Sequence, residues 1–116
     1  MTPLSQPILA VVIPCSRVQY LRYSLDALAH QSCKDFKVYI GDDATPDDIE
    51  SVCNEFKMNL DITYIRFDQN LGRTNLVQQW HRCIEMSSEP WIWLFSDDDT
   101  ADPECVEANQ ELIYEL

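Results

Sequence analysis

The sequence alternates strictly between short apolar segments and longer segments with helical periodicity, and this order restricts its fold more than any other feature. The apolar segments span residues 8–13, 36–40, 62–67 and 91–95, and each precedes a stretch whose apolar residues recur at helical spacing. Residues 8–13 are continuously apolar, which is typical of a central strand, and Pro14 is expected to end it. Such alternation predicts a doubly wound α/β chain, βαβαβαβα, with a parallel sheet of strand order 3-2-1-4.

Helix starts and buried helix faces follow from the same pattern. Thr45 with Pro46, and Asp102 with Pro103, predict the starts of the second and fourth helices. The expected buried helix faces consist of Leu21, Leu25 and Leu28; Ile49, Val52, Cys53 and Phe56; Leu76, Val77, Trp80, Cys83 and Ile84; and Val106, Asn109, Leu112 and Ile113.

The net charge excludes one large class of ligand. Acidic residues outnumber basic ones 20 to 8, which gives a formal net charge of −12. Such a surface repels phosphate backbones, so nucleic-acid binding through a basic face is excluded. An anionic ligand would need a divalent cation between it and these carboxylates. The two glycines, Gly41 and Gly72, are too few for the phosphate-binding motif GxGxxG and too far apart for GxxxxGK[ST].

The five cysteines are odd in number and widely spaced, without a CxxC motif or a histidine at metal-ligand spacing. We expect them to be reduced and mostly buried, as in cytosolic proteins. Residues 1–7 carry no basic segment, and the longest apolar run, 8–13, is far too short for a membrane span or a secretory signal. We therefore expect a cytoplasmic location.

The place of a binding site follows from the predicted topology. In an open parallel sheet, ligands bind at the carboxyl ends of the strands, in the crevice where the strand order reverses. For the order 3-2-1-4, this crevice lies between the first and fourth strands. The segments that leave the four strands are 14–17, 41–45, 70–73 and 96–99.

Three adjacent aspartates, Asp97, Asp98 and Asp99, follow the fourth predicted strand. They repel one another, so a cation or strong hydrogen-bond donors are expected to meet them. Mg²⁺ or Mn²⁺ suits such carboxylates, because hard cations complete their coordination with water and substrate phosphates. The alternative is that these residues only precede a helix and favour its dipole. Because Asp102 already caps that helix, we favour the ligand or metal role.

Single polar and aromatic residues are less informative. Asp43 fits either a ligand contact or a turn in which it bonds its own backbone. Arg73, at a helix start, opposes the helix dipole unless a phosphate lies between them, although a solvated arginine is the simpler interpretation. Trp80 lies on an apolar helical stripe, and Trp91 and Trp93 share one strand face, so core packing is favoured over stacking on a base or sugar.

Taken in order, several features resemble the nucleotide-sugar half of family 2 glycosyltransferases of the A-type fold. These features are the strand ending in Pro14, the pair Asp42-Asp43 followed by Ala44-Thr45, the turn Asn70-x-Gly72, and the run 96–99 with Pro103 after it. The resemblance covers nearly the whole chain. It implies a Rossmann-like domain over residues 1–116 that binds a UDP-sugar or a similar donor together with Mg²⁺ or Mn²⁺.

The resemblance also implies roles for individual residues. The position matching Asp43 accepts a hydrogen bond from a ring N–H of the base, the one matching Asp97 faces the ribose, and the one matching Asp98 coordinates the metal. The implied nucleotide-binding residues are Pro14, Cys15, Ser16, Asp43, Gly72, Arg73 and Asp97, and the implied metal ligands are Asp98 and Asp99. The implied reaction is displacement at the anomeric carbon with inversion, and the metal acts as Lewis acid for the leaving diphosphate.

Members of that family continue beyond the position matching Leu116, with a segment that brings the acceptor site and the catalytic base. We therefore expect a truncated sheet, donor binding without turnover, and self-association through the edge of the fourth strand. The full-length enzyme is expected to use a glycan or lipid-linked acceptor, and a peripheral membrane location for it stays open. Two alternatives remain, a non-catalytic nucleotide-binding module and a flavodoxin-like signalling domain such as a receiver. A receiver carries its acidic pair after the first strand, where this chain has Pro14-Cys15.

Overall fold

Four parallel strands and four helices alternate along the chain. The computed structural model describes residues 7–115, and for residues 113–115 it describes the backbone alone. The elements are β1 (Leu9–Cys15), α1 (Leu21–Ala29), β2 (Phe36–Asp42), α2 (Ile49–Phe56), β3 (Ile62–Arg66), α3 (Leu76–Ile84), β4 (Trp91–Leu94) and α4 (Cys105–Glu115). The strands pair in the order β3-β2-β1-β4, all parallel, which confirms the predicted α/β fold and strand order.

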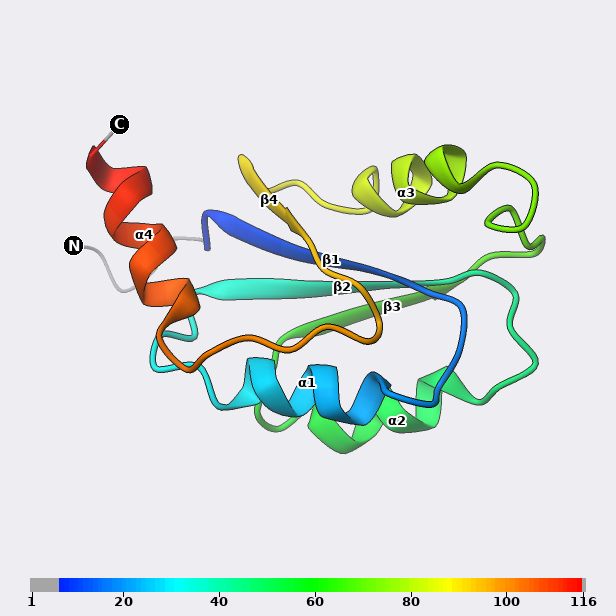
Figure 1. The fold of residues 1–116 in the computed structure, drawn as a ribbon, viewed down its shortest axis with the longest axis horizontal. Helices are drawn as coiled ribbons and strands as arrows, with labels where there is room; N and C mark the ends of the chain where they lie inside the picture. Colours follow the sequence, from blue (N-terminus) through cyan, green and yellow to red (C-terminus); the bar gives the residue numbers. More distant parts are fainter. Residues whose placement is uncertain (1–6, 116) are drawn as a thin grey trace.

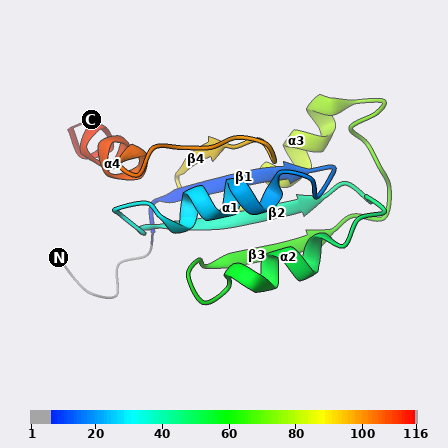
Figure 2. The same cartoon turned by 60° about the horizontal axis from the view of Figure 1, so that its bottom comes forward.

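The helices cover the two faces of the sheet unequally. Helices α1 and α2 lie together on one face, and α3 lies alone on the other (Figures 1 and 2). The core under α1 and α2 is the larger one and takes in alternate residues of β1 and β2 together with Val106 of α4. The core under α3 is small, with Ala10, Val12, Tyr39 and Cys83 as its buried residues. Ile113, predicted to be buried on α4, has a side chain outside the described residues.

Strand β1 continues through Pro14 to Cys15, so the prediction that Pro14 ends this strand is wrong. The hydrogen bonds explain why a proline fits. The carbonyl of Cys15 accepts from Asp43 of the β2 side, and the carbonyl of Val12 accepts from Phe95 of the β4 side. Backbone groups alternate in direction along a strand, so Pro14 faces the β4 side, where β4 has already ended at Leu94. Its missing N–H therefore costs no ladder hydrogen bond.

The start of α2 differs from the prediction as well. Asp48, not Thr45, is the N-cap, and its carboxylate accepts a hydrogen bond from the backbone N–H of Ser51. The backbone N–H of Thr45 instead donates to Asp42 Oδ1, while its hydroxyl accepts from the N–H of Asp47. The turn after β2 therefore uses Thr45, and the helix begins three residues later than a cap at that residue would place it.

Helix α3 contacts the sheet through only part of its predicted face, since Cys83 and Ile84 pack there but Leu76, Val77 and Trp80 do not. Gln79 and Cys83 are its buried residues, whereas Leu76, Val77 and Trp80 are 49%, 68% and 38% exposed. Gly41 explains the contact with Cys83, since a Cβ at position 41 would collide with Cys83 Sγ. Helix α3 therefore contacts the sheet at Gly41, and most of its apolar residues lie on the side away from the sheet.

The outer edge of β4 is also apolar and open. Trp91, Ile92 and Leu94 are 42%, 42% and 40% exposed, so core packing was a wrong expectation for Trp91. Trp93 does pack against the larger core and lies edge to face with Phe95, with ring centroids 5.0 Å apart. Self-association through this edge stays a prediction.

Two further properties concern the surface and the thiols. All five cysteines are free thiols, and three of them are buried.

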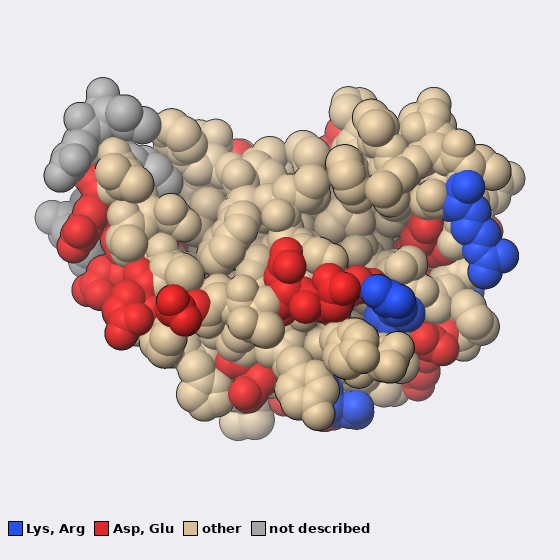
Figure 3. All heavy atoms as spheres, viewed as in Figure 1, with Lys and Arg blue, Asp and Glu red and all other residues tan. Residues whose placement is uncertain are grey.

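Acidic side chains gather over α4 and over the segment that follows β4 (Figure 3). Among residues 7–115, no helix combines the length and the apolar character that a bilayer crossing requires.

Candidate functional site

A cleft of about 580 Å³ lies at the carboxyl ends of the strands, where the predicted crevice was placed. The connections that follow β1, β2 and β3 come together at this end of the sheet, on the right of Figure 1. All seven residues predicted to bind a nucleotide line the cleft: Pro14, Cys15, Ser16, Asp43, Gly72, Arg73 and Asp97. The cleft has the size of ordinary small-molecule sites. The sheet therefore brings these residues together, although their contacts with a ligand stay predictions.

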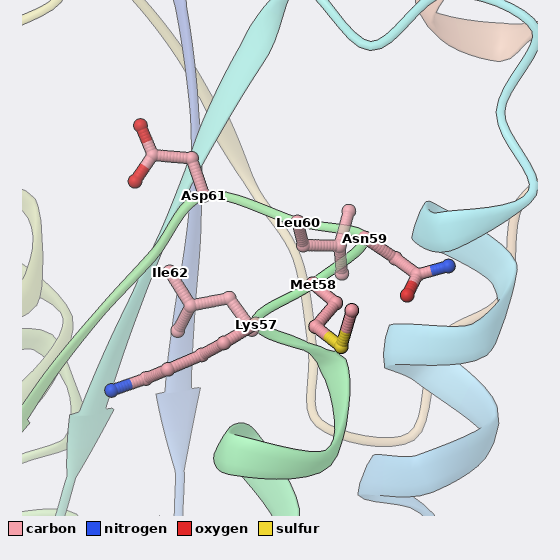
Figure 4. Close-up of a pocket in the computed structure, with 6 residues that line it drawn as sticks. All are labelled: Lys57, Met58, Asn59, Leu60, Asp61 and Ile62. Atoms are coloured by element: carbon pink, nitrogen blue, oxygen red, sulfur yellow. The ribbon is translucent and has the colours of Figure 1, made fainter.

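A second hollow lies elsewhere, at the turn between α2 and β3. Its lining is one continuous stretch of chain, 57–62 (Figure 4). The side chains of Met58, Asn59 and Asp61 are exposed, and no polar groups from other elements converge there. This hollow has none of the features that a specific small-molecule site needs.

Asp43 forms one wall of the cleft and is held from several sides. Its side chain is 2% exposed. Oδ1 accepts from the backbone N–H of Leu71 at 2.7 Å, and Oδ2 accepts from that of Gly72 at 3.0 Å. A Cβ at position 72 would lie 2.6 Å from Oδ2, so the close approach needs a glycine. Asn70 completes the link by donating to the carbonyl of Asp43.

Arg82 of α3 supplies the charge that faces Asp43. Its Nη2 lies 2.7 Å from Asp43 Oδ1, and its guanidinium stacks over the Phe67 ring at 4.0 Å from the centroid. Gln79 accepts from Arg82 Nε at 2.6 Å, and the carbonyl of Gln69 accepts from Nη2. Asp43 Oδ1 thus accepts two hydrogen bonds and Oδ2 one. One lone pair of Oδ2 is left for a further donor.

Asp97 joins the loops that follow β1 and β4. It is 6% exposed, and its Oδ2 accepts from the backbone N–H of Ser16 at 3.0 Å. Cys15, directly before Ser16, also lines the cleft. Burial, reinforced by the negative charge of Asp97, raises the pKa of the Cys15 thiol far above its usual range. Cys15 is therefore a neutral wall of the cleft and not a nucleophile.

Asp98 and Asp99 lie in a tight turn beside the cleft. The backbone N–H of Ser96 donates to Asp99 Oδ2, and the N–H of Asp99 donates to the Ser96 carbonyl. The Ser96 hydroxyl donates to Asp98 Oδ1 at 2.6 Å, and Arg17 Nη2 lies 3.4 Å from Asp98 Oδ2. Asp98 lies outside the cleft lining, whereas Asp99 lines a smaller hollow next to it.

The fit of a metal ion can be judged from these carboxylates. Within residues 7–115, no three His, Cys, Asp or Glu side chains converge as a complete metal site. Asp98 and Asp99 together offer exposed, hard oxygen ligands at one edge of the cleft. Mg²⁺ is commonly held by one or two carboxylates plus substrate phosphates and waters. The donor set therefore fits a hard cation that arrives with a phosphorylated ligand.

Arg73 lies in the cleft lining on the loop before α3, and its side chain is exposed. Its backbone N–H donates to Asn70 Oδ1, whereas Asn75 caps the helix through a hydrogen bond from the N–H of Gln78. Arg73 is thus two residues outside the helix cap. The guanidinium makes no hydrogen bond or ion pair with another residue of the described part, so it is free to meet an anion.

Sequence reasoning missed several residues of the site. Arg82 and Gln79 interrupt the apolar pattern of α3, and this break was the available signal for a buried polar network. Arg17 and Asn70 were noted only as loop residues, and both line the cleft. Trp80, expected in the core, also lines the cleft, so that expectation is wrong.

Structural comparison finds the same architecture in longer protein chains. Staphylococcus aureus TarS, residues 1–349, in complex with UDP superposes with a TM-score of 0.83 at 19% identity, over 92% of this chain and 32% of that one. The complex of the same protein with UDP-GlcNAc gives 0.82 at 18% identity, over 92% and 31%. The mannosyltransferase PcManGT from Pyrobaculum calidifontis, in complex with GDP-Man and Mn²⁺, gives 0.69 at 15%, over 84% and 29%.

The present chain thus spans about a third of the length of these compared chains. At such identities the likeness shows the fold alone. A comparison with curated protein sequences found no match. The sequence model of the family described as Glycosyl transferase family 2 matches residues 10–115, which is nearly the whole chain. This chain belongs to glycosyl transferase family 2.

Proposed function

We propose that the chain binds a nucleotide-diphosphate sugar in the cleft and forms the donor-binding part of a glycosyltransferase. The enzyme would transfer the sugar to an acceptor with inversion at the anomeric carbon. The observation that carries this proposal is the pair of buried carboxylates, Asp43 and Asp97, in one cleft of a family 2 chain. Buried carboxylates at the mouth of a sheet favour a ligand that offers hydrogen-bond donors.

Asp43 is proposed to bind the base. Its Oδ2 has an open lone pair, and a carboxylate can only accept a hydrogen bond. Uracil offers a ring N–H to such an acceptor, whereas the matching ring nitrogen of cytosine is itself an acceptor. The complexes of TarS with UDP and UDP-GlcNAc support a uridine donor.

Asp97 is proposed to face the ribose, whose hydroxyl groups are donors. Its Oδ2 accepts from Ser16, which leaves Oδ1 for the ligand. Arg73 and the wall formed by Pro14, Cys15 and Ser16 complete the proposed nucleotide contacts. Arg73 is proposed to meet the diphosphate, because it is a cation on the rim of the cleft just before α3.

Asp98 and Asp99 are proposed to hold Mg²⁺ or Mn²⁺ together with the donor. When bound, the cation would neutralise the leaving diphosphate. The Mn²⁺ in the PcManGT complex supports this choice. The residues of this chain would orient the donor: Asp98 at the metal, Asp97 at the ribose and Asp43 at the base.

The acceptor is proposed to be a glycan or a lipid-linked sugar. No residue of this chain is assigned as the general base that would deprotonate the acceptor hydroxyl, because the described carboxylates of the cleft are used for base, ribose or metal. We therefore propose that this chain alone binds the donor without transferring it. Of the alternatives, the family match argues against a signalling domain.

A thermal-shift screen of nucleotide-sugars tests the proposal. The probes are UDP-GlcNAc, UDP-glucose, GDP-mannose and CMP-sialic acid, each with Mn²⁺ and with EDTA. A ligand at 100 times its dissociation constant stabilises the folded state by about 2.7 kcal/mol, which a melting curve resolves. We expect a shift with a UDP-sugar that depends on Mn²⁺. A melting temperature unchanged by every probe would overturn the proposal.

A further inference from the structure

A smaller hollow of about 220 Å³ adjoins the cleft at Trp80. Its lining consists of Pro14, Trp80, Leu94, Phe95, Ser96 and Asp99. Pro14, Trp80 and Ser96 also line the cleft, so the two spaces meet at these three residues. Asp43 and Gly72 line the cleft alone, which places the hollow on the side away from the proposed base contact.

Trp80 has the position of a ligand-contacting residue. It is 38% exposed, although it is the largest apolar side chain of α3. Gln79 and Cys83 fill the contact between this helix and the sheet, and Gly41 lets Cys83 approach the strand. The indole N–H of Trp80 has no hydrogen-bond partner within residues 7–115. The ring thus offers both an apolar face and an unused donor.

We propose that Trp80 and this hollow form the subsite for the sugar ring of the donor, an inference that rests on the proposed nucleotide-sugar function. One face of a pyranose carries C–H groups that pack on an indole ring, and its rim carries hydroxyl groups. Ser96 and Asp99 supply polar atoms at the edge of the hollow.

The order of the contacts supports this placement. A base at Asp43 and a ribose at Asp97 place the diphosphate toward Ser96, which lines both spaces. A group attached beyond the diphosphate then enters the hollow beside Trp80. Leu94 and Phe95 form an apolar floor there, which suits a ring that packs by its face and not a second phosphate.

Calorimetric titration of UDP and UDP-GlcNAc, both with saturating Mn²⁺, separates the sugar contact from the nucleotide contact. Trp80→Ala is expected to weaken UDP-GlcNAc binding by about tenfold and to leave UDP binding within about twofold of wild type. Trp80→Phe should keep most of the sugar contact. Val77→Ala is the matched control, because Val77 is 68% exposed on the same helix and lines neither space.

The outcomes distinguish the two proposals. If wild type binds neither UDP nor UDP-GlcNAc, the proposed function fails. If wild type binds UDP but Trp80→Ala weakens both ligands equally or neither, or if UDP-GlcNAc, UDP-glucose and UDP-galactose all fail to bind, the sugar subsite is wrong. The indole N–H resonance of Trp80, identified by its loss in Trp80→Phe, should shift with the UDP-sugar and much less with UDP.

Discussion

The guanidinium of Arg82 lies 2.7 Å from the carboxylate of Asp43, and the two side chains are only 20% and 2% exposed. This ion pair fastens α3 to the carboxyl end of β2. Two backbone N–H groups, of Leu71 and Gly72, hold the same carboxylate. The proposed base contact is thus fixed before any ligand arrives, which lowers the cost of ordering it on binding.

Removing the guanidinium should destabilise the fold strongly. Arg82→Gln leaves the buried Asp43 carboxylate without its cation, and we expect a loss of about 3 kcal/mol in the free energy of unfolding. Urea unfolding followed by circular dichroism measures it. Arg22→Gln is the control, because it breaks the exposed Arg22–Glu55 pair between α1 and α2 and should have little effect. Equal losses in the two variants would contradict the importance of the buried pair.

Gly72→Ala should weaken nucleotide binding more than it affects folding. The added methyl group would lie 2.6 Å from Asp43 Oδ2, so the carboxylate must move from its present position. We expect UDP affinity to fall by about tenfold, equivalent to losing one hydrogen bond to a charged group. Calorimetry of both proteins with UDP and Mn²⁺ tests this. Unchanged affinity would show that the position of Oδ2 is unimportant to the ligand.

Asp98→Asn should remove the Mn²⁺-dependent part of nucleotide binding. The proposed metal ligand is lost, while the side chain keeps its size. The control is Asp61→Asn, which makes the same change of charge on the exposed turn before β3. Melting curves with UDP, with and without Mn²⁺, distinguish a local ligand from the general attraction of a chain of net charge −12. The assignment fails if the two variants respond to Mn²⁺ alike.

The buried thiols predict a loss of stability at alkaline pH. Burial raises the pKa of Cys53 and of Cys83 to about 12, from an ordinary value of 9.0. The folded state therefore keeps these protons while the unfolded state releases them. Their contribution is fully present below pH 9 and is lost as pH rises toward 12. Under reducing conditions, the urea midpoint of the wild type should fall between pH 8 and pH 10.5. The midpoint of Cys53→Ala should fall less steeply over the same range.

The strand order was predictable because each strand is an apolar run and each crossover a helix, and parallel connections allow few topologies. The end of β1 was not predictable from the sequence. Whether a proline ends a strand depends on which neighbour its backbone nitrogen faces, and at Pro14 that neighbour has already ended. The start of α2 was not predictable either, because the Thr45 N–H donates to the Asp42 carboxylate and Thr45 becomes part of a turn.

The cleft residues were predictable from the loops that leave the strands, but the network behind them was not. The apolar stripe of α3 suggested that Trp80 is buried, whereas the contact of Gly41 with Cys83 decides which face meets the sheet. The pairing of Arg82 with Asp43 joins residues 39 positions apart and depends on that same rotation. Such relationships come from tertiary packing, which overrides local patterns.

The central claim is that the cleft binds a uridine nucleotide through the open acceptor of Asp43, and wild-type protein alone can test it. Calorimetric titration with UDP and with CDP, both in Mn²⁺, compares a base that offers a ring N–H with one that places a lone pair there. We expect one UDP site and an affinity for CDP at least about tenfold weaker, as for loss of a hydrogen bond to a charged group. Absence of UDP binding, or equal affinity for UDP and CDP, would contradict the account.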